Sequence, residues 1–201
     1  GVNAARKLRG EGDFVLSRSE SYIGTLIDDL VTKGTNEPYR IMTSRSEYRL
    51  LLRQDNADQR LTRRGYDIGL VSEERLRAVE EKYAAVDREI RRLTHTGASP
   101  SPALSAFLAE RGTADVTDGC PLAALLRRPQ LHYDDLAPFD PTRPDLPADV
   151  REQVEIRVKY EGYIQRQQKQ VEEFRRMESH RLPPGLDYAS IQGLRLEARE
   201  K

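Results

Sequence analysis

The chain has 201 residues, with 33 basic and 33 acidic side chains and therefore no net charge. This length suits one domain or two small ones with a real hydrophobic core. Hydrophobic residues make up 37% and charged residues 33%, a balance that favours exposed helices around a thin core. No apolar run reaches the roughly 18 residues of a membrane span, and charges throughout the first twenty residues exclude a secretory signal. With Cys120 as the single cysteine no internal disulfide can form, so we expect a soluble, cytoplasmic protein.

The first third of the chain predicts helices separated by polar turns. Residues 1–7 have the pattern of the end of a helix that starts upstream. Ser17 and Glu20 form a capping-box signature, and the apolar spacing after them predicts a helix of about twelve residues. After a loop, Ser44 and Glu47 repeat this signature and predict a second helix, which carries a dense set of arginines.

Two further helices follow in the sequence. Residues 55–58 are turn formers that end the arginine-bearing helix, and a short basic helix is expected after them. Ser72 then caps an amphipathic helix whose apolar stripe runs from Leu76 to Leu93.

The second half is rich in proline before it becomes helical again. Eight of the eleven prolines lie between Pro100 and Pro147, and short helices are expected at 103–110 and 122–128. From Pro147 one apolar face continues to about His180, which predicts a long helix with a solvated, charged flank. A further small helical element is expected between Leu186 and Leu196.

Basic residues are concentrated between Lys33 and Arg64 and outnumber the acidic residues there. They are Lys33, Arg40, Arg45, Arg49, Arg53, Arg60, Arg63 and Arg64, against Glu37, Glu47, Asp55 and Asp58. On a helix, Arg45, Arg49 and Arg53 would form a row of guanidiniums spanning about 12 Å, which suits a polyanion. A guanidinium matches phosphate and carboxylate equally well, so the same spacing is also typical of a solvated helix face with intrahelical ion pairs.

Motifs of self-contained catalysis are absent from the sequence. It has no glycine-rich phosphate loop, no Cys or His cluster at metal-ligand spacing and no nucleophile elbow. His95, His132 and His180 are far apart and are interpreted as structural, and Cys120 is assigned no chemistry. We therefore expect no catalytic, cofactor-binding or metal-binding residue, and a helical binding or assembly module.

Several stretches resemble one known family. They are Ile27–Thr35, Glu37–Arg40, Thr43–Arg53, Asp55–Asp58, Arg60–Thr62, Gly69–Leu70, Lys159–Ile164 and Asp187–Tyr188. The family is that of the glucose-inhibited division proteins (GidA/MnmG), the flavin-dependent tRNA uridine 5-carboxymethylaminomethyl modification enzymes. The resemblance extends over nearly the whole chain and is weakest in the proline-rich middle.

This resemblance implies an all-α fold, the helical C-terminal region of a larger flavoenzyme, with several amphipathic helices and a proline-rich middle. Residues 1–16 would end the flavin-binding domain, and 17–96 would form a helical domain with the basic motif. Residues 97–149 would be the short-helix region, and 150–201 the long helix and the start of a C-terminal subdomain. FAD and NADH would bind the parent protein outside this segment, and the fragment alone is expected to hold no cofactor and to be inactive.

The resemblance also implies partners. The parent enzyme works with a partner GTPase and a folate one-carbon donor, forms a homodimer, and modifies C5 of the wobble uridine of tRNA. The eight basic residues between Lys33 and Arg64 would contact tRNA. The alternative is a structural helical module that mediates dimerisation or supports the flavin domain, with the same arginines holding the two domains together.

Overall fold

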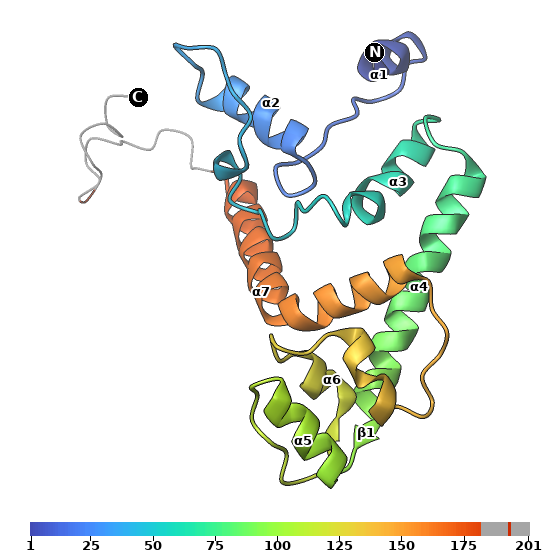
Figure 1. The fold of residues 1–201 in the computed structure, drawn as a ribbon. Coiled ribbons are helices and arrows are strands. Elements are labelled where there is room, and N and C mark those ends of the chain that lie inside the picture. Colours follow the sequence, from blue (N-terminus) through green and yellow to red (C-terminus); the bar gives the residue numbers. More distant parts are fainter. Residues whose placement is uncertain (182–192, 194–201) are drawn as a thin grey trace. The chain divides into compact units, whose positions relative to one another are not determined.

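The computed structural model describes residues 1–181 and 193. The chain divides into two compact units, Gly1–Gln167 and Gln168–Lys201, and the account below concerns the first except where stated. The predicted all-α fold is confirmed (Figure 1). In the described part the strands are limited to β1 (Gly97–Ala98) and β2 (Cys120–Pro121), which pair antiparallel. The element expected between Leu186 and Leu196 lies outside the described residues.

The N-terminal part contains α1 (Val2–Leu8) and α2 (Tyr22–Thr32). Ser21 caps α2, since its Oγ accepts a hydrogen bond from the Gly24 amide at 2.9 Å. The prediction that Ser17 is the cap is wrong, because α2 begins only at Tyr22. Glu20 does accept from the Ser17 amide at 2.8 Å, as in a capping box, but this bond closes a turn that precedes the helix. This turn packs directly on α2: a Cβ atom at Gly24 would lie 2.1 Å from the Ser17 carbonyl oxygen.

Arg18, in that turn, holds three carboxylates. Its Nε and Nη2 donate to the two oxygens of Glu47 at 2.8 and 2.9 Å. Its Nη1 donates to Asp28 at 2.9 Å and to Asp29 at 2.6 Å. The hydrogen bond to Glu47 contributes most to raising the pKa of Arg18 above its ordinary value. One side chain thus ties the segment around Glu47 to α2.

Asp29 extends this cluster to the loop after α2. Its side chain is 5% exposed and accepts from Lys33 Nζ at 2.8 Å and from the Tyr39 hydroxyl at 2.6 Å. These hydrogen bonds, first that of Lys33 and then that of Tyr39, hold the pKa of Asp29 well below its usual range although burial opposes them. The chain from Lys33 to Glu47 is therefore fastened to α2 at both of its ends.

The predicted arginine-bearing helix is wrong. Residues Thr43–Arg45 form a short 3₁₀ turn (η1), and the chain then continues in turns to α3 (Ala57–Asp67). The carboxamide of Gln167 donates to the Glu47 carbonyl at 3.0 Å and accepts from the Leu51 amide at 3.1 Å. In an α-helix those two backbone groups would bond to each other. The Leu51 amide bonds to the Tyr48 carbonyl at 3.0 Å and to Gln167, and the Glu47 carbonyl accepts from Gln167 in place of the Leu51 amide.

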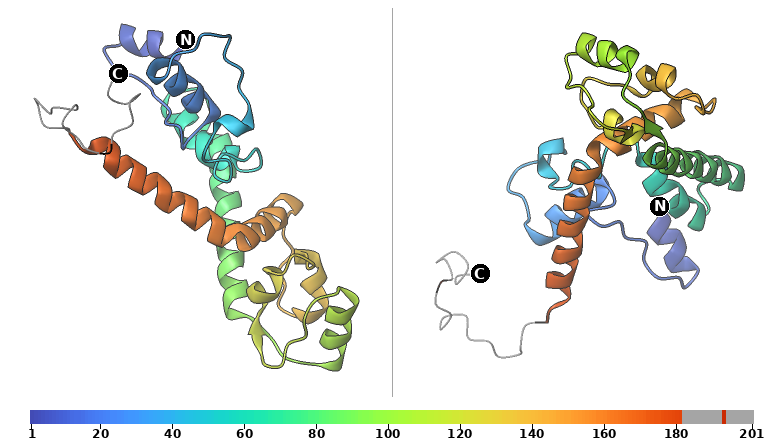
Figure 2. Two further views of the ribbon diagram at one scale, coloured as in Figure 1. Left: turned by 90° about the vertical axis from the view of Figure 1, so that its left-hand side faces the viewer. Right: turned by 90° about the horizontal axis from the view of Figure 1, so that it is seen from below.

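The helix capped by Ser72 is confirmed as α4 (Glu73–His95), with Ser72 Oγ accepting from the Arg75 amide at 3.3 Å. It packs against α3 near its start and against α6 (Leu122–Leu126) farther along (Figures 1 and 2). The predicted apolar stripe is buried at Leu76, Val86 and Leu93. The long helix α4 thus connects the N-terminal part to the hydrophobic core.

The core lies in the proline-rich region and the helices beside it. There α4 and α6 combine with α5 (Pro102–Glu110), the 3₁₀ segment η2 (Tyr133–Phe139) and the first turns of α7 (Ala148–Ser179). The most deeply buried side chains of this core include Val86, Leu93, Leu104, Leu108, Leu122, Leu125, Leu126, Leu131 and Val154. The short helices predicted between the prolines are confirmed. They bury leucines around α4 instead of forming a loose linker.

Beside this core, Glu89 and Asp140 are buried and form hydrogen bonds with Arg92. Arg92 donates to Glu89 at 2.7 Å and to Asp140 at 2.9 Å, and the Tyr133 hydroxyl donates to Glu89 at 2.7 Å. Burial, together with the contact to Glu89, raises the pKa of Tyr133 to about 12.

None of the helices in the described residues is long and apolar enough to cross a membrane.

The two adjacent aspartates of α2 make a matched test of the Arg18 cluster. Asp29→Asn removes the buried negative charge that pairs with Arg18 and Lys33. We therefore expect the free energy of unfolding, measured in urea, to fall by about 2–4 kcal/mol. Asp28→Asn, at a side chain 40% exposed, should cost under about 1 kcal/mol. Equal losses in the two variants would contradict this account.

The same cluster sets a dependence on pH. Because the pKa of Asp29 is lower in the folded than in the unfolded chain, its stabilising effect is present above the unfolded value of about 3.9 and is lost as pH falls toward the folded value. Stability measured from about pH 5 down to pH 3 should therefore decline more steeply for the unsubstituted chain than for Asp29→Asn.

Candidate nucleic-acid interface

The structure separates the eight predicted basic residues into three groups. Arg53 and Arg60 belong to the fold itself. Arg53 binds the Asp55 carboxylate through Nε at 2.9 Å and donates from Nη1 to the Leu50 carbonyl at 2.6 Å. Arg60 donates to the carbonyl oxygens of Glu20 and Arg53, at 2.5 and 3.0 Å. Burial, more than the nearby charge of Arg53, lowers the pKa of Arg60. These two guanidiniums organise the turns between α2 and α3.

The second group consists of surface cations with carboxylate partners. Lys33 pairs with Asp29, Arg63 with Glu80 and Arg64 with Glu20. Arg63 also lies over the ring of Tyr66, 5.9 Å from its centre. The pairs of Arg63 and Arg64 lie at the surface and contribute little to stability, whereas Asp29, the partner of Lys33, is buried.

The third group is Arg40, Arg45 and Arg49, which are exposed. Within residues 1–181, each lies without a carboxylate contact. Arg45 lies over the ring of Tyr39, 5.1 Å from its centre. The acidic neighbour that could have paired with Arg45 or Arg49 is Glu47, and Arg18 occupies both of its oxygens. The expected row of Arg45, Arg49 and Arg53 does not form, because the segment is not helical and Arg53 pairs with Asp55.

Two residues that organise this region were not identified from the sequence. Arg18 lies outside the basic segment, and Gln167 contacts it from more than a hundred positions away. The serine-rich signature around Arg18 was the one local signal, and it indicated a helix cap. No pattern in the sequence connects Gln167 to Leu51.

An apolar stripe on α2 lies on the opposite side of that helix from Asp29. Ile23, Ile27 and Val31 follow at intervals of four residues and are 62%, 50% and 75% exposed. The inward side of α2 carries Thr25 and Asp29, which are buried. The helix therefore directs polar groups into the fold and apolar groups outward.

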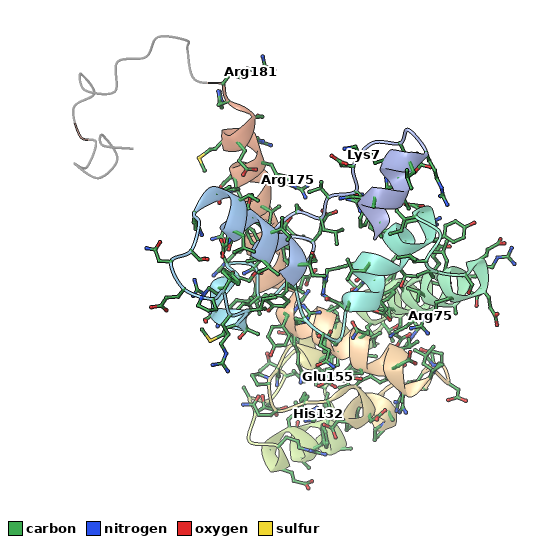
Figure 3. All side chains as sticks on the ribbon, turned by 90° about the horizontal axis from the view of Figure 1, so that it is seen from above. Lys7, Arg75, His132, Glu155, Arg175 and Arg181 are labelled. Atoms are coloured by element: carbon green, nitrogen blue, oxygen red, sulfur yellow. The ribbon has the colours of Figure 1, made fainter. Side chains whose placement is uncertain are left out.

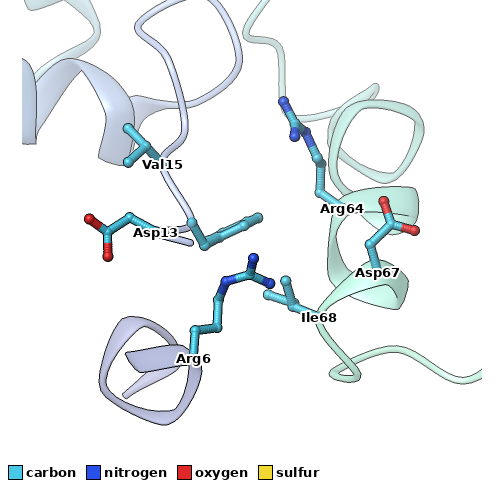
Figure 4. Close-up of a pocket in the computed structure, with 7 residues that line it drawn as sticks. Arg6, Asp13, Val15, Arg64, Asp67 and Ile68 are labelled. Carbon is cyan, nitrogen blue, oxygen red and sulfur yellow. The ribbon is translucent and has the colours of Figure 1, made fainter. Parts of the chain in front are cut away.

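A polar hollow of about 240 Å³ lies between the segment after α1 and α3 (Figure 4). Arg6 and Arg64 line it together with Asp13 and Asp67. Arg6 pairs with Glu11 at 3.2 Å, and Arg64 pairs with Glu20. Its cations thus already have partners within the chain.

His132 is part of a surface network and not of a catalytic pair (Figure 3). Its Nδ1 lies 2.8 Å from Glu155, which also accepts from Lys159 Nζ and from the Tyr133 amide, each at 2.9 Å. Burial alone would raise the pKa of Glu155, but these hydrogen bonds outweigh it and lower the pKa.

The described residues do not fit a flavin or a metal ion. A dinucleotide is held where a parallel strand leads through a glycine-rich turn into a helix, and the strands described here have two residues each and pair antiparallel. No group of three or more metal-ligating side chains occurs in residues 1–181.

Comparison with known proteins places the chain in a family. Residues 73–168 match the family model of the tRNA modifying enzyme MnmG/GidA C-terminal helical domain. Over 201 residues the chain is 53% identical to the tRNA uridine 5-carboxymethylaminomethyl modification enzyme MnmG of Caldicellulosiruptor saccharolyticus and 50% identical to that of Bacillus subtilis (strain 168). Each match covers 100% of this chain and 32% of the relative.

A solved structure agrees with these matches. Aquifex aeolicus GidA, in its form II crystal, superposes with a TM-score of 0.76 and 38% identity over 99% of this chain and 31% of that chain. The chain thus spans just under a third of the length of these relatives. It belongs to the MnmG/GidA family, and it corresponds to the helical C-terminal part of its members.

Proposed function

We propose that this chain is the tRNA- and partner-binding region of an FAD-dependent tRNA modification enzyme. With a partner GTPase, that enzyme installs the carboxymethylaminomethyl group on C5 of the wobble uridine. The observation that carries the proposal is the third group of arginines: Arg40, Arg45 and Arg49 are exposed and have no carboxylate contact in the described chain.

The surroundings of these arginines favour phosphate as their ligand. Arg18 neutralises Glu47, which lies between Arg45 and Arg49, so positive charge outweighs the remaining negative charge of Glu37 in this segment. A guanidinium presents a fork of donors that matches the oxygens of a phosphate. Arg63 and Arg64 add further positive charge in exposed pairs, which an incoming phosphate can replace. Lys33 adds a partly exposed ammonium that stays paired with the buried Asp29.

The remaining chemistry of the proposed enzyme belongs to the part of its relatives that this chain does not span. FAD and NADH would bind there, and the full-length protein would act in the cytoplasm as a homodimer. The present residues would hold the substrate while the reaction takes place elsewhere in the protein.

The α2 stripe supports a second function, docking to another part of the parent protein or to a second copy. Three exposed aliphatic side chains on one helix face form a contact surface, and full burial of each is worth about 1.5–3 kcal/mol. Such docking does not require RNA contact by the arginines.

A salt titration of tRNA binding tests the first function. For each of Arg40→Ala, Arg45→Ala and Arg49→Ala, we expect the slope of log affinity against log salt to become shallower by about 0.7–0.9, because one phosphate contact is lost. Arg75→Ala is the charge-matched control, since Arg75 is exposed on α4 outside the segment. Slopes that are unchanged in all three variants would exclude phosphate contact and favour docking.

Arg53→Ala and Arg60→Ala should behave differently. Each removes a half-buried guanidinium that satisfies backbone carbonyls, so we expect a loss of about 2–3 kcal/mol in the free energy of unfolding. Arg49→Ala should stay within about 0.5 kcal/mol of the unsubstituted chain. Urea denaturation of the three variants distinguishes the fold-forming arginines from the exposed ones.

A further inference from the structure

Two tyrosines are exposed on α7, at some distance along the sequence from the basic segment. Tyr160 and Tyr163 are 43% and 59% exposed, one helical turn apart on the same face. Their ring centres lie 6.4 Å apart, with the ring planes at 53°. Each ring thus leaves aromatic surface uncovered by the described fold.

A shallow hollow of about 520 Å³ lies beside Tyr163 and is rich in cations. Lys159 and Arg166 line it from α7, and Arg127 lines it from the end of α6. Arg127 pairs with Glu161 at 2.7 Å and Lys159 with Glu155 at 2.9 Å. Arg166 has no carboxylate contact within the described chain, so the hollow as a whole is positive.

Gly162 lies in the same hollow and has no structural reason to be glycine. A Cβ atom at this position would meet nothing within 4 Å. Inside a helix, glycine is less stable than alanine by roughly 0.5–1 kcal/mol. The missing side chain leaves the helix backbone accessible in the hollow that Tyr163 also lines.

We propose that this surface is a second RNA contact, in which an unpaired nucleobase stacks on Tyr163 and its phosphate binds Arg166. Gly162 lets the base lie against the helix backbone. Proteins commonly bind single-stranded RNA with aromatic rings that lie next to cations. Every base can stack on a ring, and every nucleotide has a phosphate that a cation can bind. The inference rests on the proposed function, in that tRNA is taken as the ligand.

A docked protein is the competing occupant, and the composition of the hollow argues against it. The centre of a protein–protein contact is depleted in Lys and Glu, whereas Lys159 and Glu161 both line this hollow. Aliphatic side chains, which a protein partner would use equally well, are exposed on α2 instead.

Fluorescence gives a direct test, because the chain contains no Trp. Tyr163→Trp places the single indole at the proposed stacking position. Titration with an in vitro transcribed tRNA should quench its emission, and a fully paired RNA duplex should quench it much less. Ala106→Trp, at an exposed position of α5, is the control and should not respond. No quenching at position 163 by a tRNA that binds the chain would overturn the proposal.

Substitutions at the same site separate stacking from folding and from apolar contact. Tyr163→Phe should keep tRNA affinity, and Tyr163→Leu should weaken it by about fivefold or more, since leucine cannot stack. Equal binding by the Leu and Phe variants would indicate an apolar protein contact and overturn the proposal.

Gly162→Ala gives two opposite readouts. It should raise the thermal midpoint, because alanine favours the helix, and it should weaken tRNA binding severalfold, because its methyl group occupies the space beside the ring. A variant that is more stable and binds equally well would overturn the role given to Gly162. A different result would be a shallower salt slope of tRNA binding in the Arg40, Arg45 and Arg49 variants while Tyr163→Leu binds tRNA with unchanged affinity. That result would leave the proposed function intact and exclude only this second contact.

Discussion

The hydrogen bonds of Arg18 to Glu47 and Asp29 are the interaction on which the segment with the exposed arginines depends. A guanidinium that serves three carboxylates fixes the geometry of everything between α2 and Leu52. It also affects the charge of that segment, because Arg18 binds both oxygens of Glu47, the acidic residue between Arg45 and Arg49. One arginine thus neutralises the carboxylates around the segment, and Arg40, Arg45 and Arg49 have no carboxylate contact in the described residues.

The Gln167 carboxamide completes this arrangement from the other side. It bonds to the Glu47 carbonyl and the Leu51 amide, the two groups that one turn of helix would have joined. A helix here would place Arg45, Arg49 and Arg53 in a row; in the turns observed, Arg53 faces Asp55 while Arg49 stays exposed. Within the first unit, the position of α7 therefore determines which arginines are exposed.

The elements predicted correctly are those with complete local signals. Helix α4 has a serine cap, acidic residues in its first turn and a continuous apolar stripe, so its limits are already set by neighbouring residues. The Ser44 and Glu47 signature is equally good locally and fails, because the carboxylate that should return to the cap is bound by an arginine 29 positions earlier. The excess of positive charge in the segment could be read from the sequence. Which arginines pair could not, since Arg18 and Gln167 are brought in by tertiary structure.

The two faces of α2 link the two proposed functions. Its inner face, with Asp29, fastens the segment that carries the exposed arginines, and its outer face presents Ile23, Ile27 and Val31. A partner that covers the outer face would restrain α2 and the segment attached to it. The chain would then lose less conformational entropy when tRNA binds. On these two proposals, docking and RNA contact would reinforce each other, because α2 presents the docking face and also fastens the segment with the exposed arginines.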